Sequence, residues 1–149
     1  WLNVTRAAQV GLSLNGLRVK DILSGVEALA SEHGARTIYG YGRGPAGIWV
    51  AGAAALDVRL KGIWLHKSPA SWQEAFRAPV HRGLHEIAFP GAAALFDVRD
   101  LLAAGSAKVY FTDPADAMRL TPPREGPYTF RPYESADADY LDRFLEAVR

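Results

Sequence analysis

The glycine-dense segment Thr37-Ile-Tyr-Gly-Tyr-Gly-Arg-Gly-Pro-Ala-Gly47 has the residue types of a strand-turn-helix site. Apolar residues lead into it, and the small-residue run 47–56 behind it is typical of a helix with almost no polar face. Hydrolases of this pattern place a serine nucleophile at such a turn, between small residues, because the backbone there is strained and crowded. Gly40-Tyr-Gly-Arg-Gly44 keeps the small flanks but has Gly42 at the serine position. A tight turn without any ligand fits the same residues, since glycine tolerates unusual backbone angles.

Gly42-Arg-Gly-Pro-Ala-Gly47 also matches G-x-G-x-x-G, the pattern of dinucleotide-binding turns. Such sites need an acid after the next strand to hold the ribose hydroxyls. The next expected strand ends at Leu65, and the His-Lys-Ser that follows contains no acid, although Lys67 could meet a 2′-phosphate. Nucleotide binding is therefore a minor alternative, and we expect no cofactor. Arg43 could reach an anionic ligand beside the helix N-terminus, or it could be a solvated side chain.

A relocated nucleophile is the second chemical possibility. Ser68 follows the same expected strand and could pair with His85 or His81 as nucleophile and base. The simpler interpretation is that Ser68-Pro69 opens a loop and caps the next turn.

His81-Arg-Gly-Leu-His85 places two histidines four residues apart, a spacing that lets both face one metal ion on a helix. Gly83 and Pro79 argue against a helix there, and Glu86 is the only nearby acid. We therefore expect two ordinary surface histidines and no metal site.

The bulk composition excludes several classes of function. The chain has 149 residues, 49% of them hydrophobic, a formal net charge of +1 and no cysteine. This length fits one domain with its own core. Disulfides, cysteine nucleophiles and thiolate metal sites are excluded, and the compartment stays open. No run of Lys and Arg suggests nucleic acid as a partner, and no apolar run reaches the roughly 18 residues that span a membrane.

Helical and strand-like patterns alternate along the chain. We expect helices over residues 19–33, 45–55, 72–77, 96–104 and 139–148, and strands over 36–41, 60–65, 108–112 and 128–133. Residues 14–20, 79–90 and 114–127 are expected as loops. Ser71 and Asp97 are expected helix N-caps, and Gly105 a helix stop. This order predicts an α/β fold with a mainly parallel sheet flanked by helices. So few strands suggest that part of the fold lies elsewhere.

The order and spacing of several segments resemble the C-terminal half of α/β-hydrolases of the bacterial acetyl xylan esterase type. The resemblance covers residues 14–118. It rests on Leu14-Asn-Gly-Leu-Arg-Val-Lys-Asp21, the glycine turn, Ala51-Gly-Ala-Ala-Ala-Leu-Asp-Val-Arg59, Phe89-Pro-Gly91, Phe96-Asp-Val-Arg-Asp-Leu-Leu102 and Asp113-Pro-Ala-Asp-Ala-Met118. In that family an Ala-Ala-Leu-Asp-x-Arg stretch follows the helix of the nucleophile turn.

Carried over position by position, the resemblance implies that Gly42 stands at the nucleophile position and Asp116 at the acid position. Asp113 is the second choice for the acid because it lies nearer the strand end. The base histidine of this fold follows the acid in the chain. All four histidines here precede Asp116, and Gly42 has no nucleophilic atom. Because loss of one triad member removes most of the catalytic rate, the resemblance implies a related domain without catalysis.

We therefore expect residues 1–149 to form one partial or degenerate α/β-hydrolase-like domain, a module of a longer protein. Its expected role is structural or accessory to a larger hydrolase, with other domains of the same polypeptide or a second copy as partners. The alternative is an active ester hydrolase that uses residues outside this segment or the Ser68–His85 pair. A secreted or periplasmic location is suggested by the resemblance alone.

Overall fold

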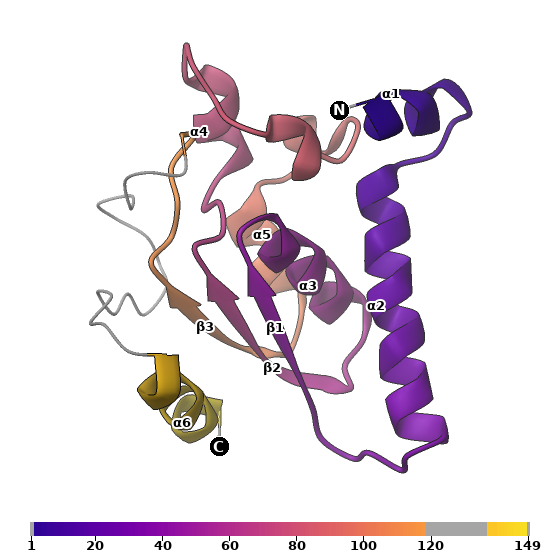
Figure 1. Ribbon diagram of the computed structural model, residues 1–149, viewed down its shortest axis with the longest axis vertical. Helices are drawn as coiled ribbons and strands as arrows, with labels where there is room; N and C mark the ends of the chain where they lie inside the picture. The colour runs from indigo at the N-terminus through magenta and orange to yellow at the C-terminus, as the bar shows by residue number, and fades with distance from the viewer. Residues whose placement is uncertain (1, 119–136, 149) are drawn as a thin grey trace.

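The computed structural model describes residues 2–118 and 137–148, and a three-stranded parallel sheet lies at its centre (Figure 1). The strands, in their order across the sheet, are β1 (Ile38–Arg43), β2 (Leu60–His66) and β3 (Lys108–Thr112). Both neighbouring pairs are parallel, with α3 (Pro45–Leu56) between β1 and β2 and α5 (Val98–Ala104) between β2 and β3. The predicted α/β fold with a parallel sheet and flanking helices is confirmed.

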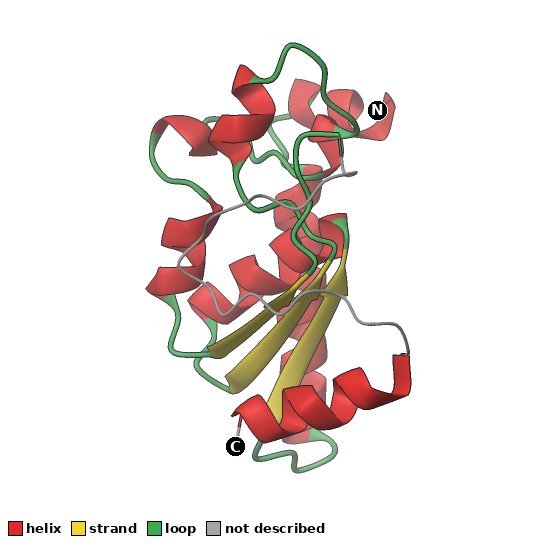
Figure 2. Ribbon diagram, turned by 90° about the vertical axis from the view of Figure 1, so that its left-hand side faces the viewer, coloured by secondary structure: helices red, strands yellow, loops and turns green. Residues whose placement is uncertain are grey.

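Helices cover both faces of the sheet (Figure 2). α2 (Leu14–Ser31), α3 and α5 form a layer on one face, and α6 (Asp137–Val148) packs on β2 and β3 from the other. Successive side chains of a strand point to opposite faces. Leu65 of β2 accordingly belongs to the large core beside α3, whereas Trp64 packs with Phe144 of α6.

α3 is buried over most of its length, as its apolar composition predicts. It lies close to β1 because glycines of the strand face it. A Cβ atom at Gly40 would lie 2.7 Å from Cγ1 of Val50, and one at Gly42 would lie 2.6 Å from the backbone of Gly47. The small residues of the glycine-rich segment therefore serve first to seat the helix on the sheet.

α2 begins at Leu14, well before the expected start at residue 19, so the loop expected over 14–20 is wrong. Ser13 supplies the N-cap, and its Oγ accepts a hydrogen bond from the amide of Gly16 at 3.1 Å. Asn15, which suggested a turn together with Gly16, is only 2% exposed and bonds to distant parts of the chain. Capping and tertiary hydrogen bonds thus outweigh the local turn signal.

The caps expected in the connection between β2 and β3 are confirmed, and they share one carboxylate. Ser71 caps α4 (Trp72–Arg77) and Asp97 caps α5. Oδ1 of Asp97 accepts hydrogen bonds from the amides of Val98 at 2.8 Å and Trp72 at 2.6 Å, and its Oδ2 accepts one from the Ser71 hydroxyl. Asp97, 7% exposed, therefore joins the starts of both helices.

The remaining differences concern short elements. The sequence patterns did not indicate α1 (Leu2–Gln9) or the 3-10 helices η1 (Leu84–Glu86) and η2 (Ala92–Ala94). β1 and β2 continue past their expected ends because Arg43 and His66 still pair with each other. The strand expected over residues 128–133 lies outside the described residues.

Candidate functional site at the carboxyl edge of the sheet

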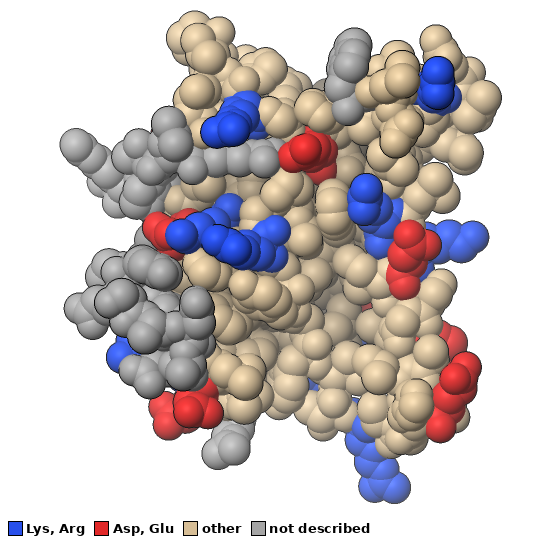
Figure 3. All heavy atoms as spheres, viewed as in Figure 1, with Lys and Arg blue, Asp and Glu red and all other residues tan. Residues whose placement is uncertain are grey.

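Three backbone corners stand in a row at the carboxyl edge of the sheet. Gly44, Lys67 and Asp113 each follow the last residue of a strand, with φ angles of 59°, 51° and 52°. The last residues of the three strands are paired in register, so the corners are neighbours. Figure 3 shows Lys and Arg side chains gathered near these strand ends. Because open parallel sheets bind ligands outside this edge, the corners frame the candidate site.

The sequence pattern suggests a corner between β1 and α3 at Gly42, but the structure places it at Gly44. β1 continues through Arg43, and Gly44 has φ 59° and ψ −130°, a combination that residues with a Cβ atom rarely adopt. A Cβ at Gly44 would meet no atom within 4 Å, whereas one at Gly42 would lie 2.6 Å from the Gly47 backbone. Only position 44 thus has room for a side chain, and neither glycine carries a reactive oxygen.

Ser68 is a packing residue of this corner. It is fully buried, and its hydroxyl lies 3.5 Å from the carbonyl oxygen of Gly42 and 3.4 Å from that of His66. The side chain also fills the space that a Cβ of Gly47 would take. The described structure contains no hydrogen bond between Ser68 and His85. A hydroxyl with no exposed surface is poorly placed to attack an ester, so the geometry does not favour the relocated pair.

The two candidate acids lie at different distances from the strand end. Asp113 directly follows β3, and its Oδ2 lies 3.7 Å from Nζ of Lys67. Asp116 lies further along the loop, where its Oδ1 accepts a hydrogen bond from the amide of Met118 at 2.9 Å. Asp116 also lines a small cavity together with His81. Asp113 is therefore the acid at the row of corners.

The histidine pair His81 and His85 does not share a helix. Gly83 between them is left-handed, with φ 63°, and η1 begins only at Leu84. Within the described ranges no group of three or more His, Cys, Asp or Glu residues could hold a metal ion.

The nucleotide-like pattern is followed by β2, at whose end a dinucleotide site would need an acid. β2 ends at His66, and the next residue is Lys67, so an acid is missing where the ribose hydroxyls need one. Lys67 instead contacts Asp113 of the neighbouring strand end.

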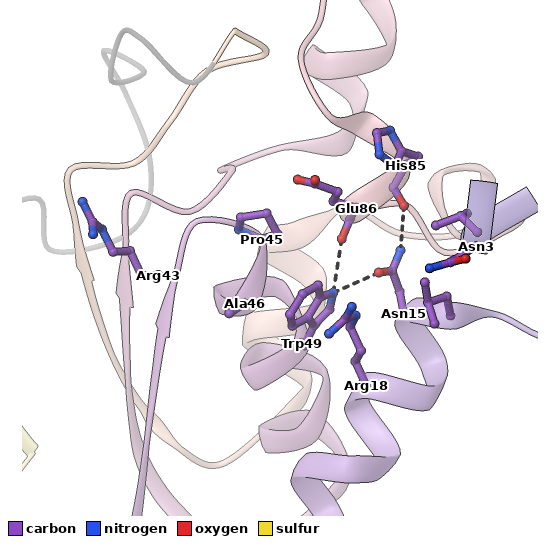
Figure 4. Close-up of a pocket in the computed structure, with 11 residues that line it drawn as sticks. Asn3, Asn15, Arg18, Arg43, Pro45, Ala46, Trp49, His85 and Glu86 are labelled. Atoms are coloured by element: carbon purple, nitrogen blue, oxygen red, sulfur yellow. Dashed lines mark hydrogen bonds between the residues drawn. The ribbon is translucent and has the colours of Figure 1, made fainter. Parts of the chain in front are cut away.

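A groove opens beside the β1–α3 corner and has a volume of about 420 Å³. It is lined by Asn3, Val4, Leu14, Asn15, Arg18, Arg43, Pro45, Ala46, Trp49, His85 and Glu86 (Figure 4). These residues come from α1, α2, the end of β1, the first turns of α3 and η1, and they span much of the described sequence. Of this set, only Arg43 was singled out from the sequence for contact with an anionic ligand.

Asn15 holds the walls of the groove together. Its Nδ2 donates hydrogen bonds to the carbonyl oxygens of Ala88 at 2.6 Å and His85 at 3.3 Å. Its Oδ1 accepts a bond from Nε1 of Trp49 at 3.0 Å, and the same indole nitrogen lies 3.2 Å from the carbonyl oxygen of Glu86. α2, α3 and η1 are therefore fixed to one another through a single buried amide.

None of the described helices has the length and apolarity needed to cross a membrane. No protein-family model, curated protein or solved structure was found to match this chain. Function therefore has to be inferred from the residues of the site.

Proposed function

We propose that the chain is a non-catalytic α/β-hydrolase-like module, related to carbohydrate esterases of the acetyl xylan type, that acts as a structural or accessory part of a larger hydrolase. The α/β-hydrolase relationship is supported by three parallel strands in sequential order, a strained corner after β1 and an acid after β3. These are the positions at which that fold carries its nucleophile and its acid.

The absence of catalysis is inferred mainly from the β1–α3 corner. Gly44 has the strained backbone of a nucleophile turn and open space for a side chain, but it offers no oxygen. Gly42 packs against the backbone of Gly47 and could not carry a side chain without displacing α3. Ser68, whose hydroxyl lies 3.5 Å from the carbonyl oxygen of Gly42, is fully buried.

A structural role is supported by the Asp57–Arg59 pair in the stretch that resembles the esterase family. Nη2 of Arg59 lies 2.7 Å from Oδ2 of Asp57, and Nε lies 3.0 Å from Oδ1, which is a bidentate geometry. Nη1 of Arg59 also contacts Glu27 of α2 at 2.7 Å. This stretch thus closes the turn from α3 into β2 and joins that turn to α2, which is a structural role and not a catalytic one.

Partners are suggested by the edge of the sheet. In the described structure β1 pairs with β2 on one side only. Its Tyr39 and Tyr41 are 37% and 52% exposed. An edge strand presents backbone N–H and C=O groups to which another strand can add. Strands from another part of the same polypeptide, or from a second copy, are therefore the proposed partners.

The proposal is tested with an ester substrate and an active-site label. The purified chain should hydrolyse p-nitrophenyl acetate no faster than the same solution of heat-denatured protein, and a serine-directed fluorophosphonate should not label it. Clear turnover together with labelling would contradict the proposal. If that turnover disappeared in Ser68→Ala, the proposal of a non-catalytic module would be replaced by that of an active hydrolase that uses the Ser68–His85 pair.

A further inference from the structure

The groove beside the β1–α3 corner has the dimensions of a ligand site. Its volume of about 420 Å³ lies within the range of small-molecule pockets, roughly 300 to 1,000 Å³. Arg43, Pro45 and Ala46 border it, and they flank Gly44, where a side chain would meet no atom within 4 Å. The groove therefore runs up to the carboxyl edge of the sheet, at the position where parallel sheets bind their ligands.

The groove is lined by two arginines that no described acid neutralises. Neither Arg18 nor Arg43 takes part in an ion pair within residues 2–118 and 137–148. Glu86 is the one acid in the lining. Figure 4 shows Arg43 at one end of the lining and Arg18 towards the other, with Pro45 and Trp49 between them. The N-terminus of α3 opens between the two and adds its partial positive charge.

Arg18 is an exposed side chain whose guanidinium lies over an aromatic ring. Its guanidinium carbon lies 4.4 Å from the centre of the Trp49 ring. Trp49 is in turn fixed by the hydrogen bonds of its indole nitrogen to Asn15 and to the Glu86 carbonyl. A guanidinium stacked on a ring keeps the N–H groups at its edge available. These groups match the two oxygens of a carboxylate or a phosphate. The groove thus presents a guanidinium group, placed over the Trp49 ring, to an incoming anion.

We propose that the groove binds a small organic anion, a carboxylate or phosphate attached to a body of about sugar size. Arg18 holds the anionic group, and the body of the ligand lies along Trp49, Pro45 and Ala46. Arg43 attracts the ligand from the other end of the groove. This site goes beyond the proposed accessory function, and it stands whether or not the chain is related to esterases.

The proposal is tested by isothermal titration calorimetry on the intact chain with three probes of similar size. Glucuronate carries a carboxylate, glucose 6-phosphate carries a phosphate, and glucose carries neither. At least one anionic probe should bind with a Kd of about 1 mM or tighter, and glucose should give no saturable heat. Comparison of the two anions decides which anionic group the groove prefers. If neither anion binds better than glucose, the proposal is wrong.

Variants locate the binding. Arg18→Gln should weaken the better anion at least about tenfold, because a charge-assisted bidentate contact is lost. Arg18→Lys keeps the charge but loses the planar guanidinium fork. Its Kd should therefore lie between that of the unchanged chain and that of Arg18→Gln. Arg43→Gln should weaken binding by a smaller factor. Arg99→Gln is the matched control, because Arg99 is an exposed arginine of α5 that does not line the groove, and it should leave the Kd unchanged.

Two further measurements separate a built site from diffuse attraction. Raising NaCl from about 20 mM to about 300 mM should weaken binding only several-fold, because the bidentate contact to Arg18 forms at hydrogen-bond distance, which is shorter than the screening length of the salt. Ala46→Trp should abolish binding by filling the groove while the far-ultraviolet circular dichroism stays unchanged. Equal losses in Arg18→Gln and Arg99→Gln, or full binding by a folded Ala46→Trp chain, would overturn the proposal. The p-nitrophenyl acetate assay is independent of these results, so the two proposals can fail separately.

Discussion

Lys67 and Asp113 occupy matching positions after two neighbouring strands, and Nζ of the lysine lies 3.7 Å from Oδ2 of the aspartate. They are the two described non-glycine residues with positive φ, at 51° and 52°. After them the two chain segments pair again, with a bridge from Pro69 to Ala115. The pairing of the two segments is therefore interrupted at these two left-handed residues and resumes two positions later in a single parallel bridge.

This strain predicts an unusual preference for glycine at position 113. Asp113→Gly should be more stable than Asp113→Ala by about 1 kcal/mol, because alanine bears the cost of a left-handed backbone and glycine does not. Urea denaturation of both variants measures the difference. Lys61 is the control, since it is an exposed residue inside β2, and there alanine should be the more stable replacement. If the glycine variant were the more stable one at both positions 113 and 61, or the alanine variant at both, the backbone strain at Asp113 would be contradicted.

Serine substitutions distinguish the two glycines of the β1–α3 turn. Gly42→Ser should destabilise the fold by about 2 to 4 kcal/mol, because the new Cβ would clash with the Gly47 backbone and force α3 away. Gly44→Ser should cost only about 1 kcal/mol, for its positive φ alone. Thermal and urea denaturation measure both values. If Gly42→Ser were the milder change, the corner would lie at Gly42 after all.

Removal of the Asn15 amide should loosen the groove. Asn15→Ala should cost about 2 to 3 kcal/mol, because the carbonyls of Ala88 and His85 and the indole N–H of Trp49 lose a buried partner. Urea denaturation gives the loss. Asn3→Ala is the control, since Asn3 lines the same groove but is exposed, and its stability should change by less than about 0.5 kcal/mol.

The Asp57–Arg59 pair predicts a pH dependence. The hydrogen-bonded guanidinium of Arg59 holds the pKa of Asp57 below its ordinary value. A carboxyl whose pKa is lower in the folded state stabilises the fold above the pKa of the unfolded chain, about 3.9, and this contribution is lost as the pH falls through the folded-state pKa. Asp57→Asn should therefore be less stable than the natural chain at pH 7, and the gap should narrow towards pH 2. Urea denaturation across this range would refute the linkage if the gap stayed constant.

Features that depend on a few neighbouring residues could be predicted from the sequence. Ser71 and Asp97 have the side chains that cap helices, and the apolar composition of residues 45–55 requires burial. The strand over 108–112 and its parallel pairing follow from the alternation of strands with helices. These features depend on residues that are near one another in the sequence, which is why the sequence alone predicts them.

Features that depend on distant contacts could not be predicted. The dipeptide Asn15-Gly16 is typical of a turn. The carbonyl groups that Asn15 binds lie some seventy positions away in the chain, so the local sequence does not reveal them. The sequence pattern points to Gly42 as the turn because all the glycines of the segment look alike. Only the folded backbone distinguishes the glycine under α3 from the glycine at the corner. The groove combines residues from five elements, and no single motif contains them.

The contact between Ser68 and Gly47 has a consequence for the evolution of this chain. The serine side chain occupies the volume that a methyl group on residue 47 would need. Substitutions at the two positions should therefore be epistatic: alanine at 47 is tolerated only after residue 68 has become glycine. A double-mutant cycle with Gly47→Ala and Ser68→Gly should give a favourable coupling energy of about 1 to 3 kcal/mol. Among diverging copies of the gene, these two codons should change together.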